Sequence, residues 1–258
     1  MKKVALITGA STGLGKEFAH IHAEKGGDLV IVARREEKLT ALKTLLEEKY
    51  GIDVVVISKD LSLANAAQDI YDQVKKQGIN IEYLINNAGF GGIGEFYKRE
   101  LSADLSMINL NIVALTSLTR LFLTDFVSEN QGKILNVSST ASLLPGPMQA
   151  VYFATKAYVT SFSNAIAEEL SDTNITVTNL MPGATATEFG EVSGMDKTPM
   201  FQKTASARKV ALDGYEAMMK GRLDIISGLT FMQKIMMASI PFTPKKILLK
   251  QIKKMQNG

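Results

Sequence analysis

Residues 4 to 15 read Val4-Ala5-Leu6-Ile7-Thr8-Gly9-Ala10-Ser11-Thr12-Gly13-Leu14-Gly15. The apolar run that opens this stretch is typical of a strand buried on both faces of a parallel sheet. From Leu14 onward, apolar residues recur with helical spacing through Phe18 and Ile21. A strand, a glycine-rich turn and a helix in this order offer backbone N–H groups and a helix N-terminus to a phosphate. The alternative is an ordinary tight turn, because glycine serves wherever φ is positive and the spacing G-x-x-x-G-x-G differs from the common G-x-G-x-x-G.

The same order of strand and helix repeats along the chain. Apolar runs predict further strands at residues 29–33, 54–57, 81–85, 133–137 and 175–180, separated by helical patterns at 36–49, 63–76, 102–126 and 152–170. This alternation predicts a parallel sheet covered by helices on both faces, with ligands at the carboxyl ends of the strands. We therefore predict a three-layer, doubly wound α/β fold of Rossmann type, with a mostly parallel sheet of about seven strands and a C-terminal helical extension.

The chain carries no internal repeat, low-complexity segment or linker, so we predict one Rossmann-type domain over residues 1–258. Within this domain we expect residues 188–224 to form a lid over the substrate. Residues 229–258 are expected to form a basic amphipathic extension.

The composition excludes several kinds of site. There is no cysteine, so disulfides, thiolate metal sites and thiol nucleophiles are excluded, and His20 and His22 lie two apart, on different helix faces. A formal net charge of +3 gives no reason to expect a nucleic-acid partner. The apolar run at residues 4–7 is too short for a signal peptide, and no run approaches the roughly 18 apolar residues that span a bilayer. We therefore expect a cytoplasmic protein.

Arg34 and Arg35 follow the predicted strand at residues 29–33. In dinucleotide-binding folds the end of this strand meets the adenosine ribose, where an acid binds the 2′-hydroxyl and an arginine accommodates a 2′-phosphate. The two guanidinium groups therefore favour NADP(H) over NAD(H). The alternative is that both arginines are merely solvated charges in a loop.

Tyr152 and Lys156 lie four residues apart in the predicted helix at residues 152–170. Positions i and i+4 share one helix face, so the phenol and the ammonium are expected to point into the same space. A buried ammonium would lower the pKa of the phenol from about 10 toward neutrality and create a usable acid or base. Taken alone, the pair could equally be a chance pairing on a helix surface.

Together these motifs resemble the short-chain dehydrogenase/reductase family, over about residues 3–190. The matching features are the glycine-rich turn 8–15, Asp60, Asn86-Asn87-Ala88-Gly89, Asn111, Ser139, Tyr152, Lys156 and Pro182-Gly183 with Thr187. The resemblance implies a Rossmann-type fold and hydride transfer between a nicotinamide cofactor and a carbonyl or alcohol.

The resemblance also implies four catalytic residues, Asn111, Ser139, Tyr152 and Lys156. Tyr152 would donate a proton to the substrate oxygen in reduction and accept one in oxidation, while Ser139 would hydrogen-bond that oxygen. Lys156 would bind the nicotinamide ribose and hold down the pKa of Tyr152, and Asn111 would support a water that relays the proton.

Two of these residues have a neighbour of the same type. Ser139 is preferred over Ser138 because it lies at the family's spacing before Tyr152, and neighbouring strand residues face opposite sides. Asn111 is preferred over Asn109 by its spacing to Ser139, which leaves Asn109 as a surface residue.

The cofactor site implied by the resemblance collects residues from the glycine-rich turn and from the ends of the strands. They are Gly9, Ser11, Thr12, Gly13, Leu14, Gly15, Arg34, Arg35, Asp60, Leu61, Asn87, Ala88, Gly89, Tyr152, Lys156, Pro182, Gly183, Thr185 and Thr187. Asp60 would accept a hydrogen bond from the adenine amino group, or else cap the following helix. Thr187 would bind the nicotinamide carboxamide.

The segments expected around the substrate are mostly apolar and offer Phe90, Phe96, Leu143, Leu144, Met148, Phe189 and Met195. Such a lining suits a hydrophobic ketone or secondary alcohol, such as an acyl, steroid-like or aromatic carbonyl compound. Packing or a subunit contact would explain the same residues equally well. The alternative function is a non-catalytic dinucleotide sensor or scaffold, but such a protein should have lost the tyrosine, lysine or serine.

Two kinds of partner are expected besides the substrate. The family resemblance suggests a homodimer or homotetramer packed through the long helices that start near Ser102 and Tyr152. From residue 225 to 258 there are six lysines and no acid, interleaved with apolar residues. That composition suits weak peripheral contact with an anionic membrane, or, as the plainer alternative, a cover over the substrate pocket or a neighbouring subunit.

Overall fold

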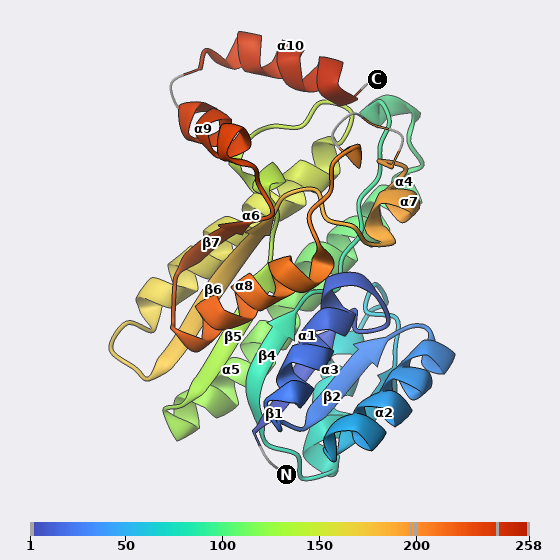
Figure 1. The fold of residues 1–258 in the computed structure, drawn as a ribbon, viewed down its shortest axis with the longest axis vertical. Coiled ribbons are helices and arrows are strands. Elements are labelled where there is room, and N and C mark those ends of the chain that lie inside the picture. The colour runs from blue at the N-terminus through green and yellow to red at the C-terminus, as the bar shows by residue number, and fades with distance from the viewer. Residues whose placement is uncertain (1–2, 197, 199–200, 241–242, 257–258) are drawn as a thin grey trace.

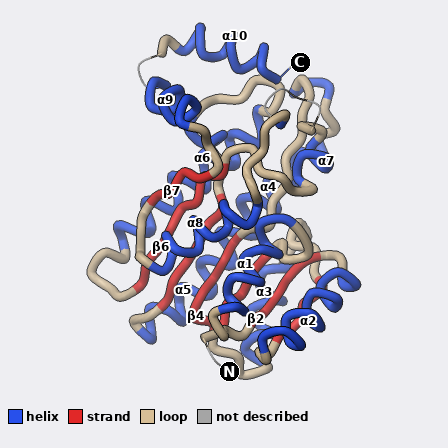
Figure 2. Tube along the Cα trace, viewed as in Figure 1, coloured by secondary structure: helices blue, strands red, loops and turns tan. Residues whose placement is uncertain are grey.

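The structure is a computed structural model that describes residues 3–196, 198, 201–240 and 243–256. Within these residues, seven strands form one parallel sheet in the order β3-β2-β1-β4-β5-β6-β7. The strands are β1 (Val4–Thr8), β2 (Leu29–Ala33), β3 (Val54–Ser58), β4 (Ile81–Asn86), β5 (Gly132–Val137), β6 (Ile175–Pro182) and β7 (Asp224–Ser227). Figure 2 shows these strands as the middle layer. The predicted three-layer Rossmann-type fold is confirmed.

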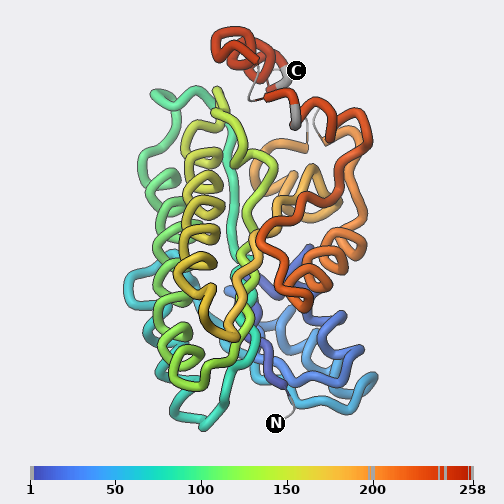
Figure 3. Tube along the Cα trace, turned by 90° about the vertical axis from the view of Figure 1, so that its left-hand side faces the viewer, coloured from blue at the N-terminus to red at the C-terminus, as the bar shows by residue number. Residues whose placement is uncertain are grey.

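Helices cover both faces of the sheet (Figures 1 and 3). One face packs against α1 (Gly13–Glu24), α2 (Glu36–Tyr50) and α8 (Ala207–Met219), and the other against α3 (Ala66–Lys76), α5 (Leu115–Glu129) and α6 (Ala150–Glu169). Neighbouring residues of one strand enter opposite cores: Ile7 joins the α1 side and Leu6 the α3 side, and both are fully buried. This is why the central strands read as unbroken apolar runs.

The strand order reverses between β1 and β4, which is where ligands bind in sheets of this kind. The glycine-rich turn follows β1, and Asn87 follows β4 directly beside it. Asn87 braces the turn, because its Nδ2 donates to the Thr8 carbonyl oxygen at 2.8 Å. The two motifs therefore meet at the reversal point of the sheet.

The helix expected at residues 102–126 is not regular. It divides into α4 (Leu101–Ile108), a π-helical segment η2 (Asn109–Ala114) and α5. The π turn carries Asn111 into a buried position, where its side chain bonds both the N–H and the carbonyl of Phe90. A π-helical turn contains one residue more than an α-helical turn, and these hydrogen bonds to another loop stabilise it. Such segments often occur at functional sites.

The run Leu101–Glu129 is long and apolar enough to cross a bilayer by length and composition alone. Part of it is buried inside the domain, and α5 packs against β4, β5 and α3. In this fold it therefore belongs to the helical layer over the sheet.

Residues 188–224, for which we predict a lid, form two different kinds of structure, and the lid stays a prediction for the first part only. The first part contains α7 (Phe189–Ser193), but α8 packs against α1 and β6 with Val210, Tyr215 and Met218 buried, because its apolar face completes the core. The C-terminal helices α9 (Phe231–Ser239) and α10 (Lys245–Gln256) extend beyond the body of the domain (Figures 1 and 3). Residues 241–242 of the tail lie outside the described part.

Candidate active site

A cavity of about 710 Å³ opens at the carboxyl ends of the central strands. All of the residues predicted for catalysis and cofactor binding line it except Gly15 and Asn111. It is walled by the turns after all six strands from β1 to β6, and roofed by α9 and α10. The structure thus brings the predicted site residues together in one continuous space.

The glycine-rich turn packs so tightly against its neighbours that a side chain at Gly9 or Gly15 would not fit. Gly9 and Gly13 have positive φ values of 68° and 55°. A Cβ on Gly9 would lie 2.7 Å from Asn87 Nδ2, and one on Gly15 would lie 2.3 Å from the Gly9 carbonyl oxygen. The turn therefore presents bare backbone at the N-terminus of α1, which fits the pyrophosphate of a dinucleotide.

Arg35, rather than Arg34, is the arginine fastened to the glycine-rich turn. Arg35 Nη2 donates to Ser11 Oγ at 3.2 Å, to Thr12 Oγ1 at 3.3 Å and to Glu188 Oε2 at 2.9 Å. Lys38 Nζ donates to the other Glu188 oxygen at 2.9 Å. Sequence reasoning missed Lys38 and Glu188. Lys38 lies one helical turn after Arg35 and could have been found from that spacing, whereas Glu188 is far away in the chain.

Arg34 is more exposed and lies beside Asp60, with 3.8 Å between Nη1 and Oδ2. Asp60 does not cap the next helix, because its Oδ1 accepts from the Ser62 backbone N–H at 2.9 Å and the Ser62 hydroxyl at 2.7 Å. Burial raises the pKa of Asp60, but the two Ser62 hydrogen bonds and Arg34 outweigh it and lower the pKa overall. Asp60 is thus an ionised acceptor at the cofactor end of the cavity.

The two serines after β5 are held in different ways. Ser138 is buried, donates to the Lys156 carbonyl oxygen at 2.9 Å and bonds Thr160 Oγ1 at 2.8 Å. Ser139 opens the short helix η3 (Thr140–Leu143), where its Oγ accepts from the Ala141 N–H at 3.1 Å, and its side chain hydrogen-bonds Tyr152. Ser139 is therefore the serine beside the phenol.

Tyr152 and Lys156 lie on one face of α6, but they are not paired as expected. Lys156 Nζ donates to the Val137 carbonyl oxygen at 2.8 Å and lies 6.0 Å from the centre of the Tyr152 ring. Burial raises the pKa of Tyr152 to about 12, and the hydrogen bond with Ser139 offsets only part of that rise. Burial also lowers the pKa of Lys156 to about 8. The expectation of a tyrosine pKa near neutrality is therefore corrected, because desolvation of the phenolate dominates.

Asn111 lies behind the cavity wall. Its Nδ2 donates to the Phe90 carbonyl oxygen at 3.0 Å and to Thr155 Oγ1 at 3.1 Å, and its Oδ1 accepts from the Phe90 N–H at 3.2 Å. A Cβ on Gly89 would lie 3.0 Å from Asn111 Oδ1 and 3.5 Å from Lys156 Nζ. Asn111 thus fixes the loop after β4 right beside the Lys156 ammonium.

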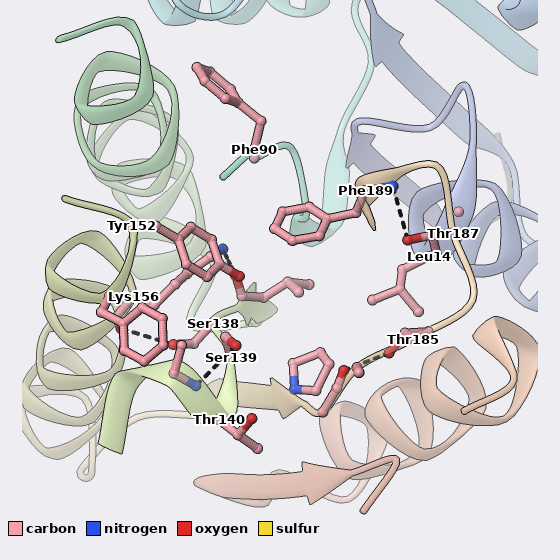
Figure 4. Close-up of a pocket in the computed structure, with 18 of the residues that line it drawn as sticks. Leu14, Phe90, Ser138, Ser139, Thr140, Tyr152, Lys156, Thr185, Thr187 and Phe189 are labelled. Atoms are coloured by element: carbon pink, nitrogen blue, oxygen red, sulfur yellow. Dashed lines mark hydrogen bonds between the residues drawn. The ribbon is translucent and has the colours of Figure 1, made fainter. Parts of the chain in front are cut away.

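The loop after β6 closes the opposite side of the cavity (Figure 4). Thr185 Oγ1 donates to the Gly183 carbonyl oxygen at 2.8 Å, and Thr187 Oγ1 accepts from the Phe189 N–H at 3.3 Å. A Cβ on Gly13 would lie 3.0 Å from the Thr187 methyl group. The loop therefore crosses directly over the glycine-rich turn, and Phe189 reaches Tyr152 with ring centres 5.5 Å apart.

The part of the cavity beside Tyr152 has an apolar wall. Of the predicted pocket residues, Phe90, Leu144 and Phe189 line the cavity, whereas Phe96, Leu143, Met148 and Met195 do not. The tail supplies lining residues that were not predicted individually: Leu229, Met236, Met237, Ile240, Leu248 and Ile252. The tail thus covers the cavity with mostly apolar side chains, together with the polar residues Gln233 and Gln251.

Comparison with known proteins identifies the family. A family profile described as "short chain dehydrogenase" matches residues 3–197. The chain belongs to the short-chain dehydrogenase family. This is a family of oxidoreductases, and in this chain the glycine-rich turn, Ser139, Tyr152 and Lys156 line one cavity at the carboxyl edge of a parallel sheet.

Short-chain dehydrogenases of known structure resemble this one closely. The Sphingobium yanoikuyae short-chain dehydrogenase in complex with NADPH is 31% identical, with a TM-score of 0.81 and coverage of 87% of each chain. A 7beta-hydroxysteroid dehydrogenase is 25% identical, with a TM-score of 0.86 and coverage of 97% of this chain and 96% of that one. Nicotinamide dinucleotides are thus the cofactor type of this fold and site.

The mouse very-long-chain 3-oxoacyl-CoA reductase is 34% identical over 195 residues. The match covers 73% of this chain and 61% of the mouse protein. The chain therefore spans about three fifths of the length of this curated relative.

Proposed function

We propose that this short-chain dehydrogenase is an NADP(H)-dependent oxidoreductase that transfers a hydride between nicotinamide and a hydrophobic ketone or secondary alcohol. The observation that carries the proposal is the single cavity that joins Ser139, Tyr152 and Lys156 to the Arg34 and Arg35 turn. One end of the space offers proton and hydrogen-bond donors, and the other offers guanidinium groups.

The bound nicotinamide would supply or accept the hydride. In reduction, the Tyr152 hydroxyl donates its proton to the substrate oxygen, and the Ser139 hydroxyl donates a hydrogen bond to the same oxygen as negative charge develops on it. The raised pKa of Tyr152 keeps the phenol protonated at neutral pH, which suits the reductive direction. Lys156 would bind the ribose hydroxyls, and Asn111 keeps the adjoining loop in place through Phe90.

The preference for NADP(H) rests on the charges at the end of β2. Arg34 and Arg35 line the cavity there, Lys38 adds a third cation close to Arg35, and β2 itself ends in Ala33 rather than an acid. A 2′-phosphate would form charge-assisted hydrogen bonds with these groups, whereas a 2′-hydroxyl would not find the acid that usually stands at the end of this strand.

The proposed substrate is a ketone attached to a long or bulky apolar group. Phe90, Leu144, Phe153 and Phe189 surround the space beside Tyr152. The relatives described above act on 3-oxoacyl-CoA and hydroxysteroid compounds, and both classes suit an apolar wall. We favour the acyl class, because the tail adds Leu229, Met237 and Leu248 to the apolar lining of the same cavity, which would give an extended acyl chain more apolar surface to contact.

We further propose a homodimer or homotetramer. Leu101, Leu105 and Val113 on the α4–η2 stretch and Tyr158 on α6 are exposed large apolar residues. A second copy packed on these helices would cover them.

A panel of 3-oxoacyl, steroid and aromatic ketones, tested with NADPH and with NADH, examines the proposal through the absorbance of the reduced nicotinamide. We expect turnover with NADPH and at least one apolar ketone. NADPH binding without turnover of any carbonyl or alcohol in the panel would favour the sensor or scaffold alternative, and equal use of NADH would contradict the reading of the arginines.

A further inference from the structure

The outer surface of α9 is an apolar helix face without a partner in the described part of the chain. Phe231 and Met232 are 76% and 70% exposed, and Ile235 and Met236 are about half exposed. The pairs Phe231 with Ile235 and Met232 with Met236 are each four apart, so all four side chains share one side of the helix. Soluble proteins seldom expose four large apolar side chains within less than two turns of one helix.

The neighbouring helix α10 carries a stripe of positive charge on its outer side. Lys246, Lys250 and Lys254 are four apart and exposed, whereas Leu248 and Ile252 face the cavity. No acidic residue occurs from residue 225 to 258. The lysines of α10 therefore have no acid within their own segment to pair with.

The inner sides of the same two helices roof the catalytic cavity. Met237 and Leu248 line it, and buried Gln256 accepts a hydrogen bond from buried Gln149, the residue just before α6. Met236 lines the cavity and is nevertheless about half exposed, so an opening of the cavity lies along the apolar face of α9. The helices α9 and α10 thus present an exposed surface on their outer side and line the cavity with their inner side.

We propose that α9 and α10 dock on an anionic lipid bilayer, with the apolar face of α9 in the acyl boundary and the lysine stripe of α10 at the phosphates. Apolar residues flanked by lysines without acids match such an interface. A second copy of the chain fits less well, because a symmetric contact would set lysine stripes against each other. The docking proposal does not depend on which reaction the protein catalyses. A second step, in which the ketone enters the cavity from the lipid past Met236, rests on the proposed function.

A tryptophan reporter tests the docking, since the natural sequence contains no tryptophan. Phe231→Trp is expected to shift its emission to the blue with phosphatidylglycerol-containing vesicles at low salt, and not with pure phosphatidylcholine vesicles. Leu45→Trp, on exposed α2 at the far end of the domain, is the matched control and should not shift. The docking is contradicted if the Phe231→Trp emission stays unchanged with both vesicles, or if both reporters shift alike.

Two triple variants test the lysine stripe by sedimentation with the same vesicles. Lys246→Gln/Lys250→Gln/Lys254→Gln should weaken binding by about a hundredfold, at roughly fivefold for each lysine near an anionic surface. Lys25→Gln/Lys49→Gln/Lys76→Gln gives the same formal net charge of 0, starting from +3, and should bind like the unmodified protein. Equal loss in both variants would show a general charge effect and overturn the proposal.

A third variant separates lipid from a second copy. Phe231→Ser/Ile235→Ser changes exposed residues only, so it should keep the fold and the oligomeric state while losing vesicle binding. If it instead dissociates an oligomer in lipid-free solution, the face is a subunit contact and the docking proposal fails. Turnover of a water-soluble ketone should be unchanged in this variant. If the unmodified protein binds the vesicles but turns over no ketone, the result would count against the proposed function and leave the docking proposal intact.

Discussion

The Arg35 guanidinium donates to the Glu188 carboxylate across the mouth of the cofactor cavity, with 2.9 Å between Nη2 and Oε2. Lys38 holds the second oxygen of the same carboxylate. The pKa of Glu188 is lowered, chiefly by the hydrogen bond with Lys38 and then by Arg35, so the carboxylate is ionised. An anion therefore already lies among the cations proposed to bind the 2′-phosphate, and it belongs to the loop that carries Phe189 to Tyr152.

Replacing Glu188 by glutamine should raise the preference for NADPH over NADH. Loss of the carboxylate frees Arg35 and Lys38 for the 2′-phosphate, and removal of one partly exposed ion pair predicts roughly a two- to fivefold tighter binding of NADPH. Quenching or enhancement of nicotinamide fluorescence measures both dissociation constants. Glu191→Gln, at an exposed position of α7, is the matched control and should leave the ratio of the two dissociation constants unchanged. A lower NADPH preference in Glu188→Gln would mean that the carboxylate helps rather than competes.

Alanine substitutions at Ser138 and Ser139 should affect different properties: one should lower stability and the other should lower turnover. Ser139→Ala removes a donor to the substrate oxygen, so turnover should fall by about 10²–10³-fold with little change in stability. Ser138→Ala removes buried bonds to the Lys156 carbonyl and Thr160, so the free energy of unfolding should fall by about 1–2 kcal/mol. Steady-state kinetics and urea unfolding of both variants check this. If Ser138→Ala proved the slower enzyme, the two assignments would be reversed.

The buried ammonium of Lys156 should make stability rise with pH. Its pKa is about 8 in the folded protein and 10.5 without burial, so the unfolded chain binds more protons between these values. The free energy of unfolding should therefore increase from pH 8 toward 10.5, by about 3 kcal/mol in total, before Tyr152 acts in the opposite sense above pH 10.

Lys156→Met should lack this increase, because no proton is exchanged at that position. Urea unfolding of both proteins between pH 7.5 and 10, in the absence of cofactor, measures the difference. A parallel pH dependence in the two proteins would show that the lysine is not desolvated in the folded state.

Much of the fold could be predicted from sequence because its central strands are buried on both faces. Val4–Ile7 and Leu29–Ala33 read as continuous apolar runs, and the structure places strands at both. The glycine-rich turn was recognisable because its close contacts leave no room for a Cβ. Requirements of this local kind restrict which residue types can occur at a position, so they can be recognised in the sequence.

Features that depend on distant contacts could not be predicted. The π turn at Asn109–Ala114 is supported by bonds from Asn111 to Phe90 and Thr155, and neither partner is near it in sequence. Glu188 pairs with Arg35 across more than half of the chain. The pKa of Tyr152 was expected to fall because Lys156 shares its helix face, but the direction depends on where the ammonium points, and it points to Val137.

The most direct test of the account is the rate of NADPH oxidation with an apolar ketone by Tyr152→Phe, measured together with the NADPH dissociation constant. The variant removes the proposed proton donor and keeps the ring that packs against Phe189. We predict that turnover falls to background while the dissociation constant stays within about twofold. Turnover at the unmodified rate, with NADPH still bound, would contradict the assignment of Tyr152 and with it the proposed mechanism.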